Sequence, residues 1–366
     1  MLNLIRFELK KICSRKIVWI GFALLLFFNI MLYRSYSLPS MSVWPDENSE
    51  YLYGAEAVEF DKAIAERYEG ELTDEKVQEM LSDFAPSQSF RERTGGMNVA
   101  AIPMNSMQVA VQSQFANYDG TWNGLTVQDV YGDSSIQVGY NTGWLNTCYY
   151  MVQVIIGIGF LLIVAISPVF SGEYSGMDAL ILTSRYGKTK CVSAKVISAF
   201  TTAFLITSVF LILNIAVSVI SFSTDGLSAS VSFAASNRFD TLPVDMSCKT
   251  LVIMQCLLAF TSIFGATAIT LFVSAVSRNT FVALAFAAVI HVFPLVIPVS
   301  EYSPIYRYLL LFPVYQGQSL FLLSLGGISL FGGSIPYAII AIPVMLVLTV
   351  IGYTLSKGVF SNHQIA

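Results

Sequence analysis

Uncharged apolar runs recur along this sequence of 366 residues, and their length constrains the fold more than any other feature. A helix needs about 20 mostly apolar residues to cross the roughly 30 Å of hydrocarbon in a bilayer. Only 12% of the residues are charged, which is about half the usual share in soluble domains. The sequence therefore predicts an all-α polytopic membrane protein with about six transmembrane helices. These helices are expected at residues 17–36, 146–170, 193–224, 250–277, 279–300 and 335–356.

The last uncharged stretch, residues 308–356, is too long for a single membrane-spanning helix. Its first half contains residues that interrupt a lipid-facing helix, among them Pro313, Gly326 and Gly332. Irregular backbone at membrane depth persists only where protein or water satisfies its polar groups. We therefore expect short re-entrant or interfacial helices over residues 301–334 before the sixth span. An arrangement with seven spans remains an alternative.

Lysine and arginine residues are sorted to one side of this six-span arrangement, which sets its orientation. Loops with an excess of Lys and Arg face the cytoplasm in multi-pass membrane proteins. The N-terminal segment, the loop between the second and third spans, and the tail at residues 357–366 are therefore expected in the cytoplasm. The residues that set this orientation are Arg6, Lys10, Lys11, Arg15, Lys16, Arg185, Lys188, Lys190, Lys195, Arg278 and Lys357.

Residues 1–16 are expected to form an amphipathic helix at the inner membrane surface. Apolar residues recur there at spacings of three and four from Leu2 to Ile12, with basic residues mainly on other faces. The alternative is a basic flank that only fixes the topology. A cleaved signal peptide is disfavoured, because the apolar region is too long and no small-residue cleavage site follows at residues 33–36.

Residues 37–145 have the composition of a soluble domain and carry an excess of acidic side chains in their first half. We expect an α+β extracytoplasmic domain between the first two spans, with a helix near residues 50–68 and a second helix capped by Thr73. A shorter external loop is expected at residues 225–249. The domain either meets a substrate or partner, for which its acidity favours a cationic ligand, or serves as a lid without specificity.

The loop at residues 171–192 is more elaborate than a simple connector between two spans needs to be. Glu173 stands where the second span ends, a short apolar stretch with Met177 and Leu180 follows, and a basic turn with Lys188 closes the loop. This layout is typical of an amphipathic element that lies under the membrane and docks on a cytosolic partner. The simpler interpretation is that the basic residues only obey the orientation rule.

A motif around this loop consists of Glu173-Tyr174, Gly176, Leu180, Leu182, Arg185 and Lys195. In this motif the sequence resembles the ABC-2 family of ATP-binding-cassette transporter permeases, particularly those of Gram-positive bacteria. The general layout is similar as well, with an N-terminal amphipathic helix, an external domain after the first span and a broken apolar stretch before the sixth. Thr183-Ser184 stands where family members often have a proline before the arginine.

The resemblance implies a permease subunit of an exporter in a bacterial plasma membrane, paired with a separate ATPase subunit and a second permease chain. The loop would act as a coupling helix seated on the ATPase. The chain itself has no ATPase motif, because Gly187-Lys188-Thr189 lacks the earlier glycine of a phosphate-binding loop and has Leu182 instead. No cofactor and no nucleic-acid partner are implied, and the cargo stays open. The residues implied in ATPase coupling are Glu173, Tyr174, Gly176, Arg185, Lys188 and Glu8.

Other candidate groups in the sequence are few. His291 lies in the fifth predicted span, where it either lines a pathway or makes a hydrogen bond inside the bundle. Cys148 and Cys248 are expected near the outer surface, as one disulfide bridge or as two free thiols. The sequence contains no hydrolase motif and no metal-ligand cluster, so no catalytic or metal-binding residue is predicted. A second functional hypothesis is a non-transporting membrane sensor or regulator that acts through the acidic external domain.

Overall fold

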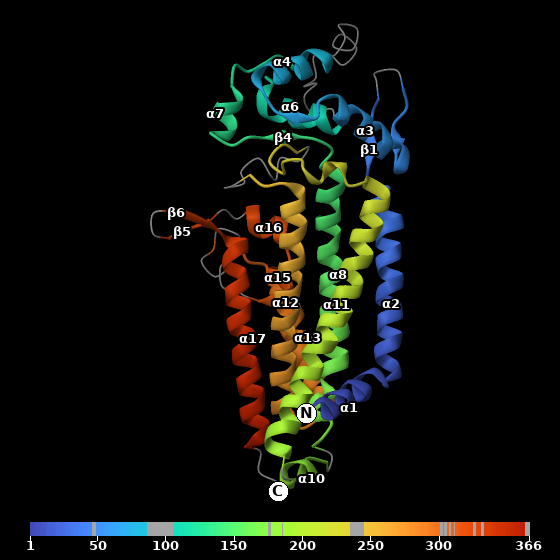
Figure 1. The fold of residues 1–366 in the computed structure, drawn as a ribbon, viewed down its shortest axis with the longest axis vertical. Coiled ribbons are helices and arrows are strands. Elements are labelled where there is room, and N and C mark those ends of the chain that lie inside the picture. Colours follow the sequence, from blue (N-terminus) through green and yellow to red (C-terminus); the bar gives the residue numbers. More distant parts are fainter. Residues whose placement is uncertain are drawn as a thin grey trace.

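Long helices run side by side in one bundle, with a small domain over one end and the helix α10 (Met177–Thr183) at the other (Figure 1). We call these the domain end and the α10 end. The computed structural model describes residues 1–45, 49–85, 105–174, 177–184, 186–234, 245–300, 303, 306, 309–310, 312–324, 327–330 and 333–362.

Within the described residues, five helical segments are long and apolar enough to cross a membrane, so the chain is a multi-pass membrane protein. They correspond to the first, second, third, fourth and sixth predicted spans. A π-helical turn (Tyr33–Ser37) extends the first segment, α9 (Pro168–Ser171) extends the second, and another π-helical turn (Gly187–Cys191) begins the third. The main helices are α2 (Lys16–Leu32), α8 (Thr142–Ile166), α11 (Val192–Phe222), α12 (Cys248–Val276) and α17 (Tyr337–Ser361).

The fifth predicted span forms a shorter helix than expected, α13 (Thr280–Val296), which has 17 residues. The prediction extended this helix to residue 300, but residues 297–300 continue without helical structure. Pro294 lies inside the last turn, where a proline removes a backbone donor and disfavours continuation of the helix. This helix is therefore near the lower limit of the length that spans a bilayer.

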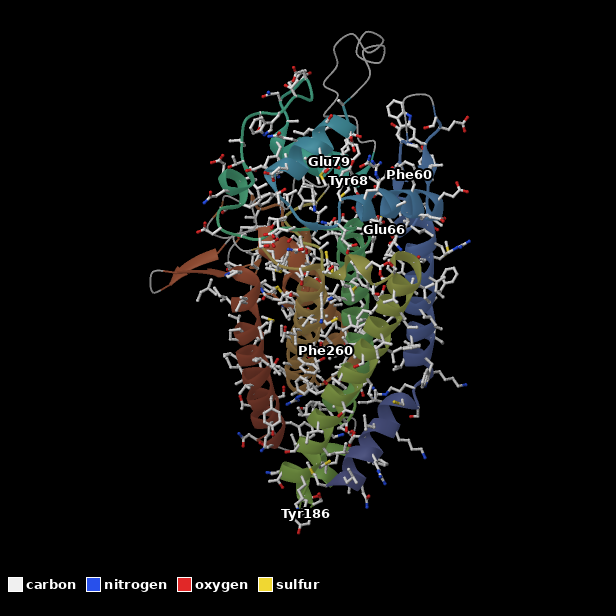
Figure 2. The ribbon with its side chains drawn as sticks, turned by 45° about the horizontal axis from the view of Figure 1, so that its top comes forward. Phe60, Glu66, Tyr68, Glu79, Tyr186 and Phe260 are labelled. Carbon is white, nitrogen blue, oxygen red and sulfur yellow. The ribbon has the colours of Figure 1, made fainter. Side chains whose placement is uncertain are left out.

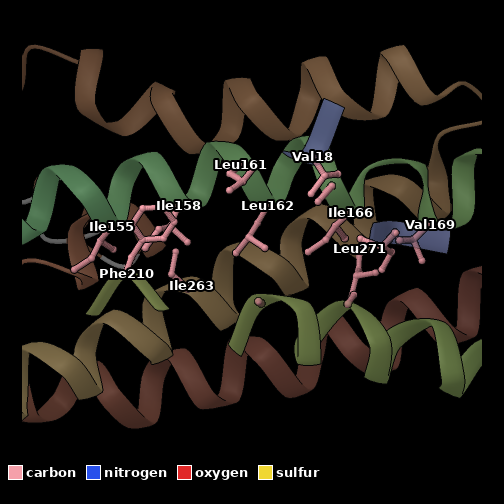
Figure 3. Packing of buried hydrophobic residues seen from close by; sticks show 14 of the residues in the cluster. Val18, Ile155, Ile158, Leu161, Leu162, Ile166, Val169, Phe210, Ile263 and Leu271 are labelled. Carbon is pink, nitrogen blue, oxygen red and sulfur yellow. The ribbon is translucent and has the colours of Figure 1, made fainter. Parts of the chain in front are cut away.

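The helix α8 lies inside the bundle, and its buried face carries large aliphatic side chains from Val154 to Ile166. Figure 3 shows Ile158 and Leu162 of α8 directed toward Ile263 of α12, with Phe210 of α11 beside them. In contrast, α2 lies at the edge of the bundle and buries one narrow stripe (Val18, Leu25 and Leu32). A seven-residue spacing is typical of helices that pack along a single neighbour.

The interrupted stretch before α17 begins with two short helices, α15 (Pro313–Gln316) and α16 (Ser319–Ser324). Side chains of α12 satisfy the polar backbone at the break between them. The Gln255 amide nitrogen donates to the Gly317 carbonyl at 2.8 Å, and the Ser319 backbone nitrogen donates to the Gln255 side-chain oxygen at 3.1 Å. These contacts supply the protein partners that irregular backbone needs at this depth.

An antiparallel hairpin of β5 (Gly327–Leu330) and β6 (Gly333–Pro336) joins this stretch to α17. The register pairs Gly327 with Pro336 and Leu330 with Gly333. Short helices were expected over all of residues 301–334, so this part of the prediction is wrong. The glycines were interpreted only as helix breaks, whereas glycines that separate two short apolar runs also favour a hairpin.

The small domain is formed by residues from the segment between α2 and α8. Its helices are α3 (Ala55–Arg67), α4 (Asp74–Asp83), α6 (Ser106–Phe115) and α7 (Val127–Tyr131). Two pairs of two-residue strands accompany them: β1 (Ser42–Val43) with β2 (Leu52–Tyr53), and β3 (Gly70–Glu71) with β4 (Gln137–Val138). Side chains such as Met80, Met107 and Phe115 form its own apolar core. Thr73 caps α4 by accepting a hydrogen bond from the Lys76 backbone nitrogen at 3.3 Å, as predicted.

The segment that connects α11 to α12 ends at residue 247, two residues before the predicted end of this loop, and contains a 3-10 turn (Asp225–Leu227) beneath the small domain. The Gln137 backbone nitrogen donates to Ser230 Oγ at 3.0 Å, and the Asn141 amide donates to the Ser230 carbonyl at 2.9 Å. The described part of the segment therefore ties the domain to the top of α8.

Candidate functional site

A cluster of buried charged side chains lies near the α10 end of the bundle. Lys195 of α11 is 1% exposed, and its Nζ lies 2.9 Å from Glu8 Oε1 and 2.7 Å from Glu173 Oε1. Lys11 also donates to Glu173 Oε1. Glu8 and Lys11 belong to α1 (Leu2–Cys13), the N-terminal helix. The cluster therefore joins α1, the segment that follows α9, and the first turns of α11.

The position of Glu173 follows from a break at the end of α8. Proline at 168 lacks a backbone N–H, so the chain leaves α8 there and begins the short helix α9. Ser274 of α12 holds this break, because its hydroxyl accepts hydrogen bonds from the backbone nitrogens of Phe170 and Ser171 at 3.0 and 3.1 Å. The Tyr174 hydroxyl donates to the carbonyl of Ala275. Two anchors on α12 thus flank Glu173.

The charges of this cluster balance, with two carboxylates against two ammonium groups. Burial alone would raise the pKa of Glu173, but the neighbouring Lys195 and Lys11 outweigh it and lower that pKa below its ordinary value. Arg15 lies close by and donates to the Ala165 carbonyl at 3.1 Å. Burial lowers the pKa of Arg15, although Glu173 and Glu8 favour its charged form.

The lowered pKa of Glu173 predicts how stability depends on pH. The ionised carboxylate contributes stability above its ordinary pKa of 4.5, and this contribution is lost as the pH falls toward the lower pKa of the folded state. We expect the wild-type chain to unfold at a higher temperature than Glu173→Gln at pH 7. This advantage should shrink as the pH is lowered below about 4.5. Thermal unfolding in detergent measures it, and an advantage that stays constant with pH would contradict the prediction.

The helix α10 carries large apolar side chains that are exposed. Met177 is 52% exposed and Leu180 is 67% exposed. Tyr186, which follows α10, lies at the extremity of the molecule (Figure 2) and is also exposed, with the Lys190 ammonium 4.1 Å from its ring centroid. A backbone hydrogen bond of 3.0 Å from the Met177 nitrogen to the Glu173 carbonyl connects α10 directly to the ion cluster.

The structure brings together only some of the residues that the sequence singled out. Glu8 and Glu173 meet at Lys195, and Tyr174 lies beside them with its ring 5.7 Å from that of Phe360. Lys188 is exposed. Gly176 and Arg185 lie outside the described residues, so their predicted roles remain predictions.

Sequence reasoning missed Lys11 as a member of this site and treated Lys195 only as part of a motif and as a residue that sets the orientation. A lysine that precedes a long apolar segment is usually interpreted as an interfacial anchor. The signal available was charge complementarity between this lysine and two carboxylates, Glu8 and Glu173, that the sequence also places at the same membrane boundary.

His291 packs inside the bundle against α8. Its Nε2 lies 3.4 Å from the Ile156 carbonyl, and its ring meets Phe160 edge-on with centroids 5.2 Å apart. The cavity beside it has a volume of about 10 Å³, which is the space for one water molecule at most. Of the two interpretations of His291, this geometry favours the hydrogen-bonded packing residue. His363 lies outside the described residues.

The remaining candidate groups are two cysteines and possible metal ligands. Cys148 and Cys248 are both buried and form no disulfide, so the alternative of two free thiols is confirmed. Among the residues that the structure describes, no three His, Cys, Asp or Glu side chains are grouped as metal ligands would be.

The chain matches no protein-family model, and no curated protein or solved structure matches it either. A functional proposal therefore rests on the chain's own geometry. Two features of the α10 end bear on it: the buried ion cluster, and the exposed apolar side chains that follow directly from it in sequence.

Proposed function

We propose that this chain is the membrane-spanning permease subunit of an ATP-driven exporter of the ABC-2 type, located in a bacterial plasma membrane. In this proposal the α10 end faces the cytoplasm and the acidic domain lies outside as an extracytoplasmic α+β domain. The distribution of basic residues supports the orientation, because Lys10, Lys11, Lys188, Lys190 and Arg278 all belong to segments at the α10 end.

The exposed apolar face of α10 is the observation that carries the proposal. Met177 and Leu180 belong to α10, which lies beyond the ends of the long helices α8 and α11 (Figure 1). Large apolar side chains that are exposed together are typical of a surface that contacts another protein or a membrane, and in the proposed topology α10 presents them to a protein partner. The proposed partner at this face is a nucleotide-binding ATPase subunit. An ATP-driven transporter needs such a subunit, and the Gly187-Lys188-Thr189 segment of this chain is not a phosphate-binding loop.

Gly187, the glycine of that candidate loop, has a structural role. A Cβ atom at this position would lie 1.5 Å from the Ile181 carbonyl oxygen, so only glycine allows the chain to pass there. The π-helical turn that begins at Gly187 leads directly into α11.

A backbone hydrogen bond from Met177 to Glu173 links α10 to the ion cluster. Glu173 is 1% exposed and is engaged by Lys195 and Lys11, so we assign it a positioning role within this chain. A movement of α10 driven by the ATPase would pull on Glu173 and, through Lys195, on α11 and α1. Charge pairs that are buried tolerate little separation, because separation leaves each charge without a partner. Met177, Leu180, Tyr186, Arg185 and Lys188 are the proposed contacts with the ATPase.

The proposal predicts that Leu180→Asp abolishes association with the ATPase. A carboxylate at the centre of an apolar contact would be buried without a partner, which costs about 2 kcal/mol or more and weakens binding at least about 30-fold. The tagged chain is purified in mild detergent from its native membranes, co-purifying subunits are identified, and ATP hydrolysis is assayed. The matched control is Leu125→Asp in the domain, where the same change is made on a side chain that is 43% exposed.

A nucleotide-binding subunit that accompanies the wild type and Leu125→Asp, and is lost from Leu180→Asp, would support the proposal. The opposite result is a wild-type chain that purifies without any ATPase under conditions that preserve a known complex of this class. That result would overturn the proposal and favour the second hypothesis, a sensor or regulator that acts through the acidic domain.

A further inference from the structure

A cavity of about 150 Å³ lies where the small domain meets the membrane-spanning helices. Its lining includes the apolar side chains of Val43, Val58 and Val109 and the polar side chains of Asp61, Tyr140 and Thr142. Ser40 and Ser42 also line the cavity and are exposed, so the cavity opens to the surface of the chain. Its volume equals that of an engineered protein cavity that accommodates one benzene molecule.

Asp61 lies on the buried face of α3 and is only 5% exposed. One of its carboxylate oxygens, Oδ1, accepts a hydrogen bond of 2.8 Å from the Ser106 backbone nitrogen at the start of α6. The next residue, Lys62, points to Asp225, with 3.8 Å between its Nζ and Oδ2 of that residue. Among the described residues, no Lys or Arg forms an ion pair with Asp61.

The Asp61 carboxylate therefore accepts few hydrogen bonds for a buried charged group. An ionised carboxylate has about four lone-pair sites, and the α6 backbone occupies one of them. Burial raises the pKa of Asp61, and the hydrogen bonds from Ser106 only partly offset this effect. A buried charge without a counter-ion is unfavourable, so a cation that entered the cavity would gain a direct pairing with Asp61.

We propose that this cavity binds a compact organic ammonium ion. The ion donates N–H hydrogen bonds to Asp61, and its carbon atoms pack against the apolar side chains of the lining. The combination of one carboxylate with apolar lining side chains selects this class of ligand. A hydrated metal ion lacks apolar surface to place there and needs several oxygen ligands. The ligand lies between β1, which follows α2, and Thr142, the first residue of α8. The inference is independent of the proposed transport function.

The test uses the full chain in nanodiscs of uncharged lipid, titrated by calorimetry with butylammonium chloride. Butan-1-ol, which has the same number of heavy atoms and no charge, is the control ligand, and empty nanodiscs correct for partition into lipid. We expect saturable binding of butylammonium and none of butan-1-ol. Asp61→Asn should weaken binding at least about 10-fold, because it removes the charge from the acceptor.

Two further variants separate a specific site from general electrostatic attraction. Glu59→Gln removes the same charge from an exposed position two residues away on α3 and should leave the affinity unchanged. Val109→Phe keeps Asp61 but fills part of the cavity and should abolish binding. Asp61→Asn retains a side-chain oxygen for the Ser106 nitrogen, and near-UV circular dichroism checks that it folds. If it does not fold, Val109→Phe decides.

Three outcomes would overturn the inference. The first is a wild-type chain that shows no saturable binding of butylammonium. The second is equal affinity for butylammonium and butan-1-ol, which would indicate an apolar cavity without charge selection. The third is a result that assigns binding to the acidic surface of the domain. Such a result is either an equal loss of butylammonium affinity in Glu59→Gln and Asp61→Asn, or a Val109→Phe variant that binds butylammonium as tightly as the wild type.

Discussion

Replacing Lys195 with methionine should lower the free energy of unfolding of the chain by about 3–5 kcal/mol, the largest effect of any single substitution that we predict. Methionine fills much of the volume of the lysine stem but supplies no charge. Glu173 keeps Lys11, whereas Glu8 has no other ion-pair partner among the described residues. A carboxylate that is 6% exposed would then remain buried without a counter-ion.

Unfolding of the purified chain by SDS in mixed micelles measures this loss. Lys188→Met is the matched control, since it removes the same charge from an exposed position before α11, where substitutions usually change stability by less than about 0.5 kcal/mol. Adding Glu8→Gln to Lys195→Met removes the unpaired charge, leaves the pair of Lys11 with Glu173 intact and should restore most of the stability. If Lys195→Met behaves like Lys188→Met, the ion cluster does not hold these helices together.

Gly352→Leu should destabilise the contact between α12 and α17 by about 3 kcal/mol, because this contact has no space for a side chain. A Cβ atom at Gly352 would lie 2.6 Å from the Cβ of Ala268 and 3.1 Å from its backbone carbonyl atoms. Small residues let membrane helices approach closely, and their packing replaces the hydrophobic driving force that lipid surroundings remove. A leucine here would push the two helices apart along much of their length.

Gly358→Leu provides the matched control in the same helix. No atom lies within 4 Å of a Cβ built at Gly358, so the leucine finds open space there. Leucine also favours helix over glycine by roughly 0.5–1 kcal/mol, so the control should be neutral or stabilising. The same SDS titration compares the two variants. Equal effects of Gly352→Leu and Gly358→Leu would show that close packing of α17 on α12 contributes little.

The sequence predicted the long helices well because an uncharged run of more than 20 residues has few alternatives in a bilayer. The sequence predicted the end of α13 less well. The apolar run of this helix continues past Pro294 to residue 300, and hydropathy alone does not indicate where a helix ends. The hairpin at residues 327–336 was missed for a related reason. Glycine marks an interruption, but its spacing alone does not decide between a helix break and a turn.

The sequence predicted some residues of the candidate site but not how they pair, because the partners are far apart along the chain. Glu8 and Lys195 are separated by 187 positions, and helical periodicity describes only neighbours within a few turns. A local signal did exist in two places. Asp61 falls on the buried face of α3 with Ala57, Val58 and Ala65, and Glu8 falls with Ile12 on the buried face of α1. An acidic residue among apolar ones at helical spacing indicates that a partner lies opposite.

The span of the ion cluster along the chain has a consequence for biosynthesis. Glu8 is made at the start of translation, but its partner Lys195 is added only after more than half of the 366 residues. Before the third long helix has been inserted, the N-terminal helix lacks the lysine partner of Glu8, although Glu173 is already available to Lys11. We expect α1 to stay accessible to proteases on nascent chains that end before Lys195 and to become protected once α11 is complete. The order in which the helices are inserted therefore limits when α1 can dock fully on the bundle.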